Sequence, residues 1–202
     1  MKVSIIIPSS LAKRKNQAAN PEEKLIRAVN SAFSQDYKDI EVIVIADGCE
    51  LTSELISNNF LDERGKLIYI DKQPPFSGNV RNAGIEAATG DIICYLDADD
   101  YLGSDHVSTI VKNFTGQWVW FNDMTLVKDK FVERECALKL GICGTSNIAH
   151  LRSMPCRWRE KNTYGTDDWN FIQQLVLSSP GVKIETPAYI VCHIPFKRGY
   201  DV

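Results

Sequence analysis

Short apolar runs and helical segments alternate through the first hundred residues. Four runs rich in β-branched residues predict buried strands, at Val3–Ile7, Ile40–Ala46, Lys66–Asp71 and Asp91–Leu96. The segments between them carry apolar residues three or four positions apart, which is typical of amphipathic helices. Regular alternation of strand and helix predicts an α/β fold with a mostly parallel central sheet flanked by helices.

Local signals indicate where these helices begin and end. Asn20 precedes Pro21 and two glutamates, a combination typical of a helix start, and Leu25, Ile26, Val29 and Phe33 then share one face. A second helix is expected around Leu51, Leu55 and Ile56. A third spans Asn79–Ala88, and we expect Gly90 to end it as a left-handed cap.

The second half of the chain has a different pattern. Trp118–Phe121 and Thr125–Val132 predict strands without long helices between them, and 152–166 shows little periodicity. Asp167 and Asp168 open a further helix, and Tyr189–Cys192 predicts a last strand. We therefore expect one domain over 1–202, in which 1–100 forms the principal half and 101–202 a smaller subregion.

Composition and charge narrow the classes of protein. The 202 residues are 44% hydrophobic and 24% charged, which suits one well-buried core. The net charge of −3 argues against a nucleic-acid partner or an anionic membrane surface. No run approaches the roughly 20 apolar residues of a membrane helix, and Met1–Pro8 does not resemble a signal peptide. Six cysteines without a C-x-x-C pair predict reduced core thiols in a cytoplasmic protein.

Polar residues follow three of the predicted strands. These are Pro8-Ser9-Ser10, Asp47-Gly48 and Asp97-Ala98-Asp99-Asp100. Because ligands of open parallel sheets gather at the carboxyl ends of the strands, we expect all three segments to line one site. Acids at such positions also cap turns and helices, which is the structural alternative.

Asp97 and Asp99 follow the predicted strand Asp91–Leu96 as acids at alternate positions. This pattern suits a hard cation such as Mg²⁺ or Mn²⁺. An EF-hand is excluded because Tyr101 and Leu102 stand where an oxygen ligand and Gly are needed. A phosphatase with an aspartyl nucleophile remains open at this point. Neither a P-loop nor a dinucleotide-binding glycine motif is present.

Four motifs together resemble the family 2 glycosyltransferases of the GT-A fold. They are SIIIPSS, IADG, GNVRNAGIEAATGDIICYLDADD and GTDDW. The most specific is the R-N-x-G segment with D-x-D at the expected distance behind it. Ser9-Ser10 and Ala46 depart from residues that are common in the family.

The resemblance implies a role for each matching residue. Pro8, Ser9 and Ser10 would line the nucleoside pocket and Asp47 would bind the base or ribose. The donor sugar and its diphosphate would contact Arg81, Asn82, Asp97 and Ala98. Metal binding would fall to Asp99 and His193, and Asp168, with Asp167 beside it, would be the general base.

The basic tail adds one expectation of its own. His193 ends the last predicted strand and is followed by Lys197, Arg198 and a bend-permitting Gly199. We expect this tail to fold over the donor, with Lys197 or Arg198 against the diphosphate.

The chemistry agrees with these roles. A nucleoside diphosphate gains negative charge as it leaves, and a bound cation stabilises that charge. An acceptor hydroxyl becomes a nucleophile when a carboxylate takes its proton, and the amino end of a helix keeps Asp168 ionised for that task. Capping of the helix is the structural alternative for both Asp167 and Asp168.

The sequence therefore predicts metal-dependent, inverting transfer of a sugar from a UDP-linked donor to an acceptor hydroxyl on a glycan, lipid or protein, with Mn²⁺ or Mg²⁺ as cofactor. One alternative is a sugar-phosphate nucleotidyltransferase, although residues 9–20 lack the glycines of its usual loop. The other is a sugar-nucleotide-binding module without turnover.

Four side chains outside the motifs have expectations of their own. We expect His106 to be solvated and His150 to be either a satisfied, partly buried ring or close to the acceptor. Trp158 and Tyr164 are candidates for stacking against an acceptor sugar, or else belong to an exposed loop packed on the core.

Overall fold

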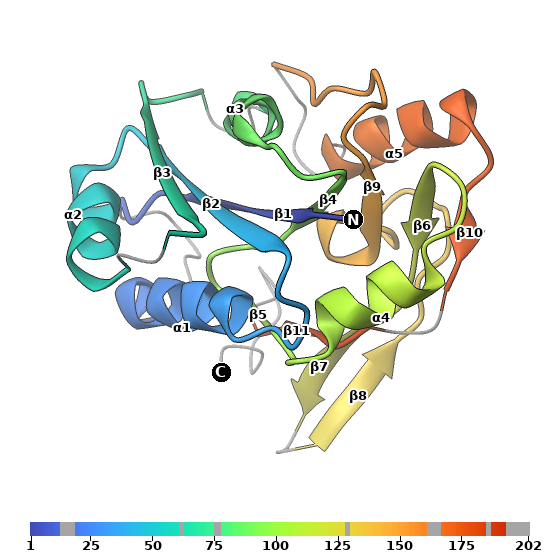
Figure 1. Ribbon diagram of the computed structural model, residues 1–202, viewed down its shortest axis with the longest axis horizontal. Helices are drawn as coiled ribbons and strands as arrows, with labels where there is room; N and C mark the ends of the chain where they lie inside the picture. Colours follow the sequence, from blue (N-terminus) through green and yellow to red (C-terminus); the bar gives the residue numbers. More distant parts are fainter. Residues whose placement is uncertain are drawn as a thin grey trace.

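The computed structural model describes residues 1–12, 19–60, 63–74, 78–127, 130–160, 167–184 and 187–192. A seven-stranded sheet forms its centre (Figure 1). In spatial order its strands are β10 (Val182–Lys183), β6 (Trp118–Trp120), β9 (Ile148–Leu151), β4 (Ile92–Tyr95), β1 (Val3–Ser9), β2 (Ile40–Asp47) and β3 (Gly65–Ile70). All neighbouring pairs are parallel except the two that involve β9. The prediction of a mostly parallel α/β sheet is confirmed.

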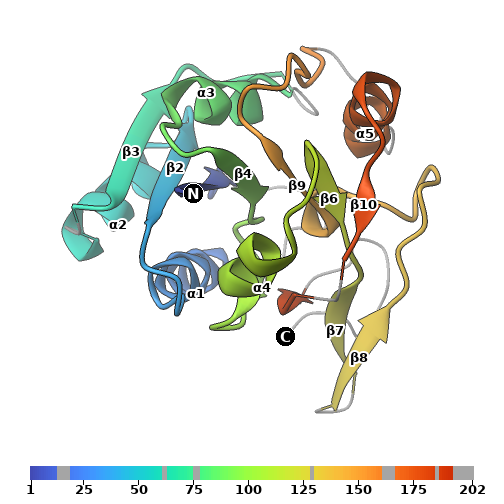
Figure 2. The same cartoon turned by 45° about the vertical axis from the view of Figure 1, so that its right-hand side comes forward.

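A smaller sheet of four strands lies beside the central one (Figure 2). Its order is β5 (Tyr101–Leu102), β11 (Tyr189–Val191), β7 (Asp123–Val127) and β8 (Lys130–Arg134). The single strand expected over Thr125–Val132 is wrong, because β7 and β8 are two strands that pair antiparallel. The central strand β9 was also not predicted, since four residues are too few to show a period.

Helices cover both faces of the central sheet. The helices are α1 (Pro21–Phe33), α2 (Glu50–Asn59), α3 (Asn79–Ala87), α4 (His106–Asn113) and α5 (Asp167–Ser178). Figure 1 shows α1 and α4 on one face and α3 and α5 on the other. Along β1, Ile5 and Ile7 pack with α1, whereas Ile6 packs with α3 and α5. Burial on both faces explains why β1 is a continuous apolar run.

Two expected details of the helix ends are wrong. Helix α1 begins at Pro21 as predicted, but Asn20 is left-handed (φ 48°) and makes no side-chain cap. Gly90 does not have a left-handed φ; such values occur among the described glycines at Gly48, Gly116 and Gly141. Gly90 is needed for space instead, because a Cβ there would lie 2.6 Å from Ser4 Oγ.

A buried carboxylate ties the amino ends of the central strands together. Glu41 Oε1 accepts hydrogen bonds from the Ser4 hydroxyl (2.6 Å) and from the backbone N–H groups of Thr89 (2.6 Å) and Gly90 (3.0 Å). Its Oε2 forms an ion pair with Lys66 at 2.8 Å. Burial alone would raise the pKa of Glu41, but Lys66 and these hydrogen bonds hold it well below its usual range. Glu41 is therefore a structural anion with its donors in place.

Buried titratable side chains complete the core. The six cysteines are free and buried, as expected. His106 is only 1% exposed, so the expectation that it is solvated is wrong. It lies edge-on to Phe121 and Tyr189, and burial lowers its pKa to about 3. In the described part of the chain, no helix has the length and apolar character needed to span a membrane.

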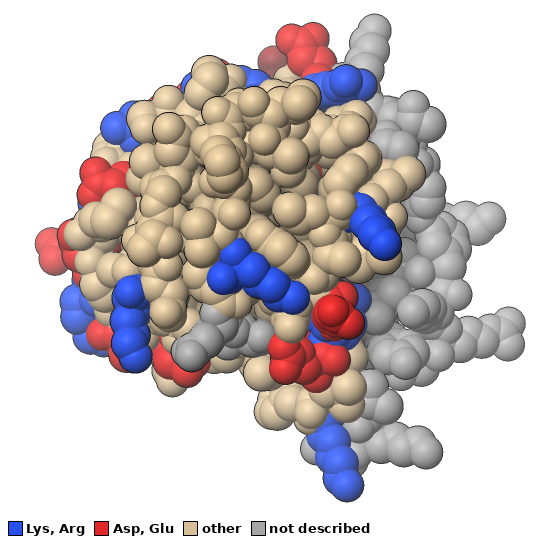
Figure 3. Space-filling view, turned by 90° about the vertical axis from the view of Figure 1, so that its right-hand side faces the viewer, with Lys and Arg blue, Asp and Glu red and all other residues tan. Residues whose placement is uncertain are grey.

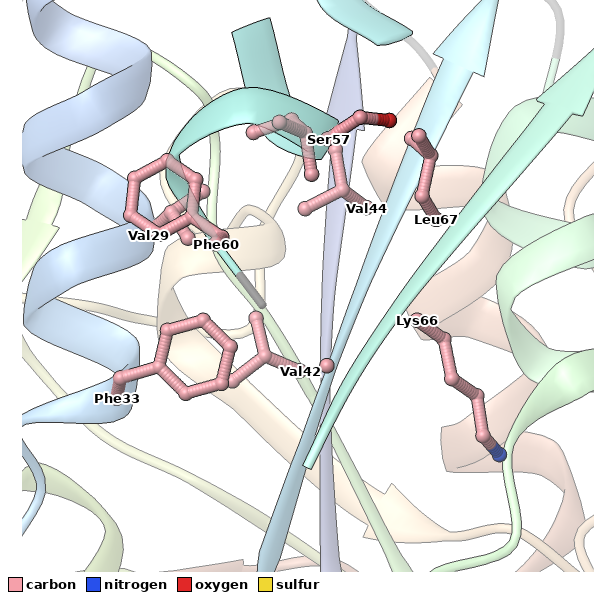
Figure 4. A pocket seen from close by; sticks show the side chains of 10 residues that line it. Val29, Phe33, Val42, Val44, Ser57, Phe60, Lys66 and Leu67 are labelled. Carbon is pink, nitrogen blue, oxygen red and sulfur yellow. The ribbon is translucent and has the colours of Figure 1, made fainter. Parts of the chain in front are cut away.

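A cavity of about 170 Å³ opens between α1, α2 and the strands β2 and β3 (Figure 4). Its lining is mainly apolar and includes Val29, Phe33, Val42, Phe60 and Leu67. Lys66 belongs to the lining, but its ammonium pairs with Glu41. None of the residues predicted to act in the functional site lines this cavity.

Candidate active site

The three predicted polar segments lie at one edge of the central sheet. Strand β1 pairs in parallel with both β2 and β4, so their carboxyl ends point the same way. The register places Ser9 beside Ala46, next to Asp47 at the end of β2, while Asp97 follows shortly after β4. The expected gathering of Ser9, Asp47 and Asp97 on this edge is therefore observed.

Asp47 is buried, and its carboxylate is already engaged by neighbouring groups. The Gln73 backbone N–H donates to Oδ1 at 2.7 Å, and the Lys72 ammonium forms an ion pair with Oδ2. Lys72 also lies 3.4 Å from Ser10 Oγ. The close approach of Lys72 depends on Gly48, whose φ is +55° and whose Cβ, if present, would lie 2.5 Å from the Lys72 Cβ. Sequence reasoning missed Lys72; its position just beyond the end of β3, after Asp71, was the available signal.

Ser9 is less available than expected. Its hydroxyl is buried and lies 3.2 Å from the Thr52 hydroxyl of α2. Pro8 and Ser10 are half-buried beside it. Within this segment, Pro8 and Ser10 therefore offer more surface to a ligand than the Ser9 hydroxyl does.

Arg81 connects α3 to the acids that follow β4. Its Nη2 donates to Asp97 Oδ1 at 2.9 Å, and its guanidinium lies 4.9 Å from the centre of the Trp158 ring. Burial opposes the charge of Arg81, but Asp97 and Asp168 raise its pKa. The Arg81 Nε is buried without a hydrogen-bond partner. Arg81 thus holds a positive charge at the edge of the site with one donor unused.

Asn82 holds the neighbouring segment of chain. Its Nδ2 donates to the Trp158 carbonyl, and the Trp158 N–H donates to its Oδ1, both at 2.9 Å. This double hydrogen bond fixes the 152–160 segment against α3. The structure therefore places the Asn82 amide on Trp158, while Arg81 faces Asp97.

The expected stacking of Trp158 on an acceptor sugar is wrong, because the residue is only 2% exposed; it packs on the core, as the alternative has it. The ring stacks on Phe171 with centroids 4.3 Å apart, and its Nε1–H donates to the Tyr95 hydroxyl at 3.2 Å. His150 lies within hydrogen-bond distance of Tyr95 Oη (2.8 Å) and the Leu151 carbonyl (2.9 Å), and burial lowers its pKa to about 4. Of the two alternatives expected for His150, the structure shows the ring with its hydrogen bonds satisfied. Tyr164 lies outside the described residues.

The acids after β4 are crowded. Asp100 is buried and accepts hydrogen bonds from the Tyr189 hydroxyl (3.1 Å) and the Cys192 backbone N–H (2.8 Å). Burial, with the nearby charges of Asp99 and Asp97, raises the pKa of Asp100 well above its usual range. The Asp99 carbonyl accepts a hydrogen bond from Arg27 at 3.0 Å. Ala98 is half-buried within this turn. Three neighbouring carboxylates therefore repel one another at this end of the sheet.

Asp167 and Asp168 begin α5, as predicted. Asp168 accepts a hydrogen bond from the Thr145 backbone N–H. A Cβ at Gly144 would lie 3.0 Å from Asp168 Oδ2, so this carboxylate sits against the chain before the short helix Thr145–Asn147. Burial raises the pKa of Asp168; Arg81 opposes the rise and Asp97 adds to it. Asp97, Arg81 and Asp168 thus lie within electrostatic reach of one another.

Asp167 has a different environment. Burial and the charge of Asp168 raise the pKa of Asp167, and its Oδ1 is buried without a hydrogen-bond partner. Neither acid of the pair is a fully satisfied helix cap.

Oxygen ligands for a hard cation are present at this edge. The crowded carboxylates after β4 are the donor set that Mg²⁺ or Mn²⁺ prefers, and a cation would relieve their repulsion. Within the described ranges, no group of three or more His, Cys, Asp or Glu side chains is arranged to hold a metal. His193 and Arg198 lie outside those ranges. Cys192, the residue before His193, is tied to Asp100.

The molecular surface beside the site carries few charges. Figure 3 looks onto the side of the molecule where α5 and β10 lie, and uncharged residues make up most of it. No charged residue occurs between Asp168 and Lys183, and Val176, Leu177 and Val182 are exposed there. Contacts through this face are therefore made mainly by uncharged groups.

A mostly parallel α/β sheet with acids and Arg81 at its carboxyl edge agrees with the GT-A class of fold. The chain belongs to glycosyl transferase family 2, whose family model matches residues 4–171. The glycosyltransferase GlyA of Streptococcus pneumoniae is 28% identical over 111 residues, which is 55% of this chain and 15% of GlyA.

Solved structures share the fold at low identity. S. aureus TarS 1–349 in complex with UDP-GlcNAc has a TM-score of 0.70 and 17% identity, over 100% of this chain and 60% of that one. Mannosyltransferase PcManGT from Pyrobaculum calidifontis, in complex with GDP-Man and Mn²⁺, has a TM-score of 0.64 and 16% identity, over 98% of this chain and 58% of that one. The chain spans at most 60% of the length of these three proteins.

Proposed function

We propose that this chain transfers a sugar from a UDP-linked donor to an acceptor hydroxyl with inversion. The observation that carries the proposal is the meeting of two segments far apart in sequence: the Arg81–Asp97 ion pair and Asp168 at the start of α5. In this proposal Arg81 would be the cation for the diphosphate and Asp168 the carboxylate for the acceptor, both at one edge of the sheet.

The donor half is proposed to lie over β1, β2 and β4. Pro8 and Ser10 would line the nucleoside pocket with the buried Ser9 behind them, and Asp47, held by Lys72 and Gln73, would face the base or ribose. Two structures with this fold support a nucleotide-sugar donor: the TarS fragment was solved with UDP-GlcNAc and PcManGT with GDP-Man. Arg81 would bind the diphosphate, and Asp97 and Ala98 the sugar edge, while Asn82 fixes the wall beside them.

We propose Asp99 as the metal ligand, with His193 as a second. The crowding of Asp97, Asp99 and Asp100 supports a cation here, as does the Mn²⁺ in the PcManGT structure. When bound, Mn²⁺ or Mg²⁺ would supply positive charge against the leaving diphosphate. The bond from Cys192 to Asp100 brings the chain before His193 to these acids.

We propose Asp168 as the general base. Its raised pKa makes it a better proton acceptor than an ordinary aspartate, and the Thr145 N–H orients the carboxylate. A base that activates the acceptor on the side opposite the leaving group gives inversion in one displacement. Asp167, with an unused buried oxygen, would contact the acceptor beside it. The closing tail with Arg198, the single domain over 1–202 and the cytoplasmic location stay predictions.

The decisive experiment separates donor binding from turnover. Titration calorimetry with UDP-, GDP- and dTDP-sugars, with and without Mn²⁺, should show metal-dependent binding that is strongest for a UDP-sugar. Asp99→Asn should greatly weaken that binding, because the charge facing the cation is lost. Asp39→Asn, an exposed acid away from the site, is the matched control and should bind like the wild type.

Asp168→Asn should bind donor and metal normally and lose turnover by about 10²- to 10⁴-fold, the range for a lost general base. Turnover near the wild-type rate would move the base to Asp167 or elsewhere. Donor binding without transfer or hydrolysis in the wild type would indicate a binding module. Release of pyrophosphate from a nucleoside triphosphate and a sugar phosphate would indicate a nucleotidyltransferase.

A further inference from the structure

The Asp168 carboxylate lies against a glycine that is not part of its own helix. A Cβ on Gly144 would lie 3.0 Å from Asp168 Oδ2, whereas Asn147 Oδ1 would be 4.0 Å away. The backbone of Gly144 is extended (φ −135°, ψ −169°), a conformation that residues with a side chain also adopt. Gly144 is therefore needed for the space that the carboxylate fills. Where Asp168 lies depends on where the chain at Gly144 is held.

Asn147 closes this part of the chain into a tight turn, 144–147. Its Oδ1 accepts a hydrogen bond from the Gly144 N–H at 3.0 Å, and its own N–H donates to the Gly144 carbonyl at 3.1 Å. Asn147 is only 3% exposed. Its Nδ2 donates to the Phe121 carbonyl at 3.1 Å, and the Phe121 N–H donates to the Asn147 carbonyl at 2.9 Å. The turn is therefore tied to the chain that follows β6.

A second anchor of the turn comes from the small sheet. Asp123 begins β7 and is 1% exposed. Its Oδ2 accepts a hydrogen bond from the Ser146 hydroxyl at 2.6 Å. Arg134, opposite Asp123 on the paired strands β7 and β8 (Figure 2), donates from Nε to Oδ1 at 2.6 Å and from Nη2 to Oδ2 at 2.5 Å. A guanidinium bound at two points fixes both the position and the direction of the carboxylate.

The stability of the fold does not by itself account for this buried pair. Taking charged groups out of water is costly, and an apolar pair of similar volume is often as stable or more so. An apolar pair would lack the third hydrogen bond, from the Ser146 hydroxyl, which joins the small sheet to the turn. The connected residues are, in order, Arg134, Asp123, Ser146, Gly144 and Asp168.

We propose that Asp123 is a positioning residue for the general base. Through Ser146 it holds the 144–147 turn, and the turn keeps the Asp168 carboxylate where it can take the proton of the acceptor hydroxyl. This inference rests on the proposed function of Asp168. A base must lie within hydrogen-bond distance of the proton that it takes, and a misplacement of about 1 Å can lower the rate by 10²-fold. Asp123 acts through the turn and not by contact with a substrate.

Hydrogen exchange tests the structural part without any assay of activity. Ser146→Ala removes the link to the turn and leaves the Asp123–Arg134 pair in place, whereas Asp123→Asn removes the charge that holds both partners. In both variants the amides of the turn should exchange about tenfold faster than in the wild type, because the turn opens more often, while those of β2 stay unchanged. Mass spectrometry of peptides that span each region measures this. Asp39→Asn, an exposed acid, is the matched control and should change neither region.

Transfer kinetics test the effect on Asp168. Asp123→Asn should lower kcat by roughly 10- to 100-fold, and Ser146→Ala by about two- to tenfold, the value of one hydrogen bond, while the donor Kd from calorimetry stays unchanged. Because both changes act through the same contact, the losses should not multiply in the double variant. A residue that only stabilised the fold would lower the amount of folded protein without separating kcat from donor binding.

Gly144→Ala tests the last contact while the hydrogen bonds of Asp123 stay in place. Its Cβ would crowd Asp168 Oδ2, so the carboxylate must move by a few tenths of an ångström. We expect kcat to fall about tenfold with the donor Kd unchanged.

Unchanged exchange of the turn in both variants would overturn the proposal, since Asp123 would then not hold the turn. Exchange that rises equally in β2 would also overturn it, because Asp123 would then only stabilise the fold. Faster exchange of the turn with kcat unchanged would overturn its link to Asp168. If Asp168→Asn turns over at the wild-type rate, the proposed base is wrong, and the exchange result still decides whether Asp123 holds the turn.

Discussion

The carboxylates at the two ends of the central sheet have pKa values that are shifted in opposite directions. At the amino end, Glu41 is buried but receives hydrogen bonds and the Lys66 ion pair, and its pKa is lowered. At the carboxyl end, Asp100 and Asp168 have fewer donors and like charges nearby, and their pKa values are raised. A buried anion with a full set of hydrogen-bond donors stabilises a fold. A buried anion that lacks such donors lowers the stability of the folded state. Groups of the second kind gather at functional sites.

The largest expected effect on stability comes from removing the Glu41 charge at the amino end of the central sheet. Glu41→Gln removes the buried charge that accepts hydrogen bonds from Ser4, Thr89 and Gly90 and pairs with the partly exposed Lys66. It should lower the free energy of unfolding by about 1–3 kcal/mol at pH 7, the cost of leaving buried polar groups unsatisfied. Because the folded pKa of Glu41 lies below its unfolded value, its contribution is present above about pH 4.5 and is lost as the pH falls. Urea unfolding at pH 7 and pH 4 measures both effects.

Glu86→Gln, on the exposed side of α3, is the control for this change and should stay within about 0.5 kcal/mol of the wild type. An equally small change for Glu41→Gln would show that the network adds nothing to stability.

A smaller effect of opposite sign is expected at the carboxyl end. Asp168→Asn removes a carboxylate that the fold disfavours when ionised, so it should gain about 0.5–2 kcal/mol, the usual range for a stabilising substitution. The pKa of Asp168 is raised, so the wild type loses stability as the pH rises from 3.8 through the folded value. The advantage of the variant should therefore grow between pH 4 and pH 7.

Thermal unfolding across that pH range, with Asp39→Asn as the control, checks this prediction. If Asp168→Asn is as destabilised as Glu41→Gln, the two ends of the sheet do not differ in the way described.

The smallest expected effect concerns the support of Arg81. Trp158→Phe weakens the cation–π contact and removes the hydrogen bond to Tyr95, and we expect the KM for the donor to rise two- to fivefold, about 0.5–1 kcal/mol. Trp158 is a positioning residue, so kcat should change less than KM. Trp120 of β6 makes a similar cation–π contact with Lys183, so Trp120→Phe is the matched control. An equal rise in KM for both variants would remove the special role of Trp158.

The local pattern of the chain determined most of the first half of the fold. β1, β2, β3, β4 and the helices between them follow from runs long enough to show a period, and parallel pairing follows from their alternation. The order of polar segments along the chain also placed Ser9, Asp47 and Asp97 on one edge. These features depend on neighbours in sequence or on a general rule of sheets, which is why the sequence sufficed.

Only the tertiary structure decided which side chains meet there. β9 inserts antiparallel between β4 and β6, and α5 packs on β4 through Phe171, which brings Asp168 toward Arg81. Lys72 reaches Asp47 only because Gly48 leaves room for it. Trp158 has polar neighbours in the sequence, yet its ring is buried against Phe171. Each of these contacts joins elements far apart in sequence, so its energy depends on packing and burial, which no local period records.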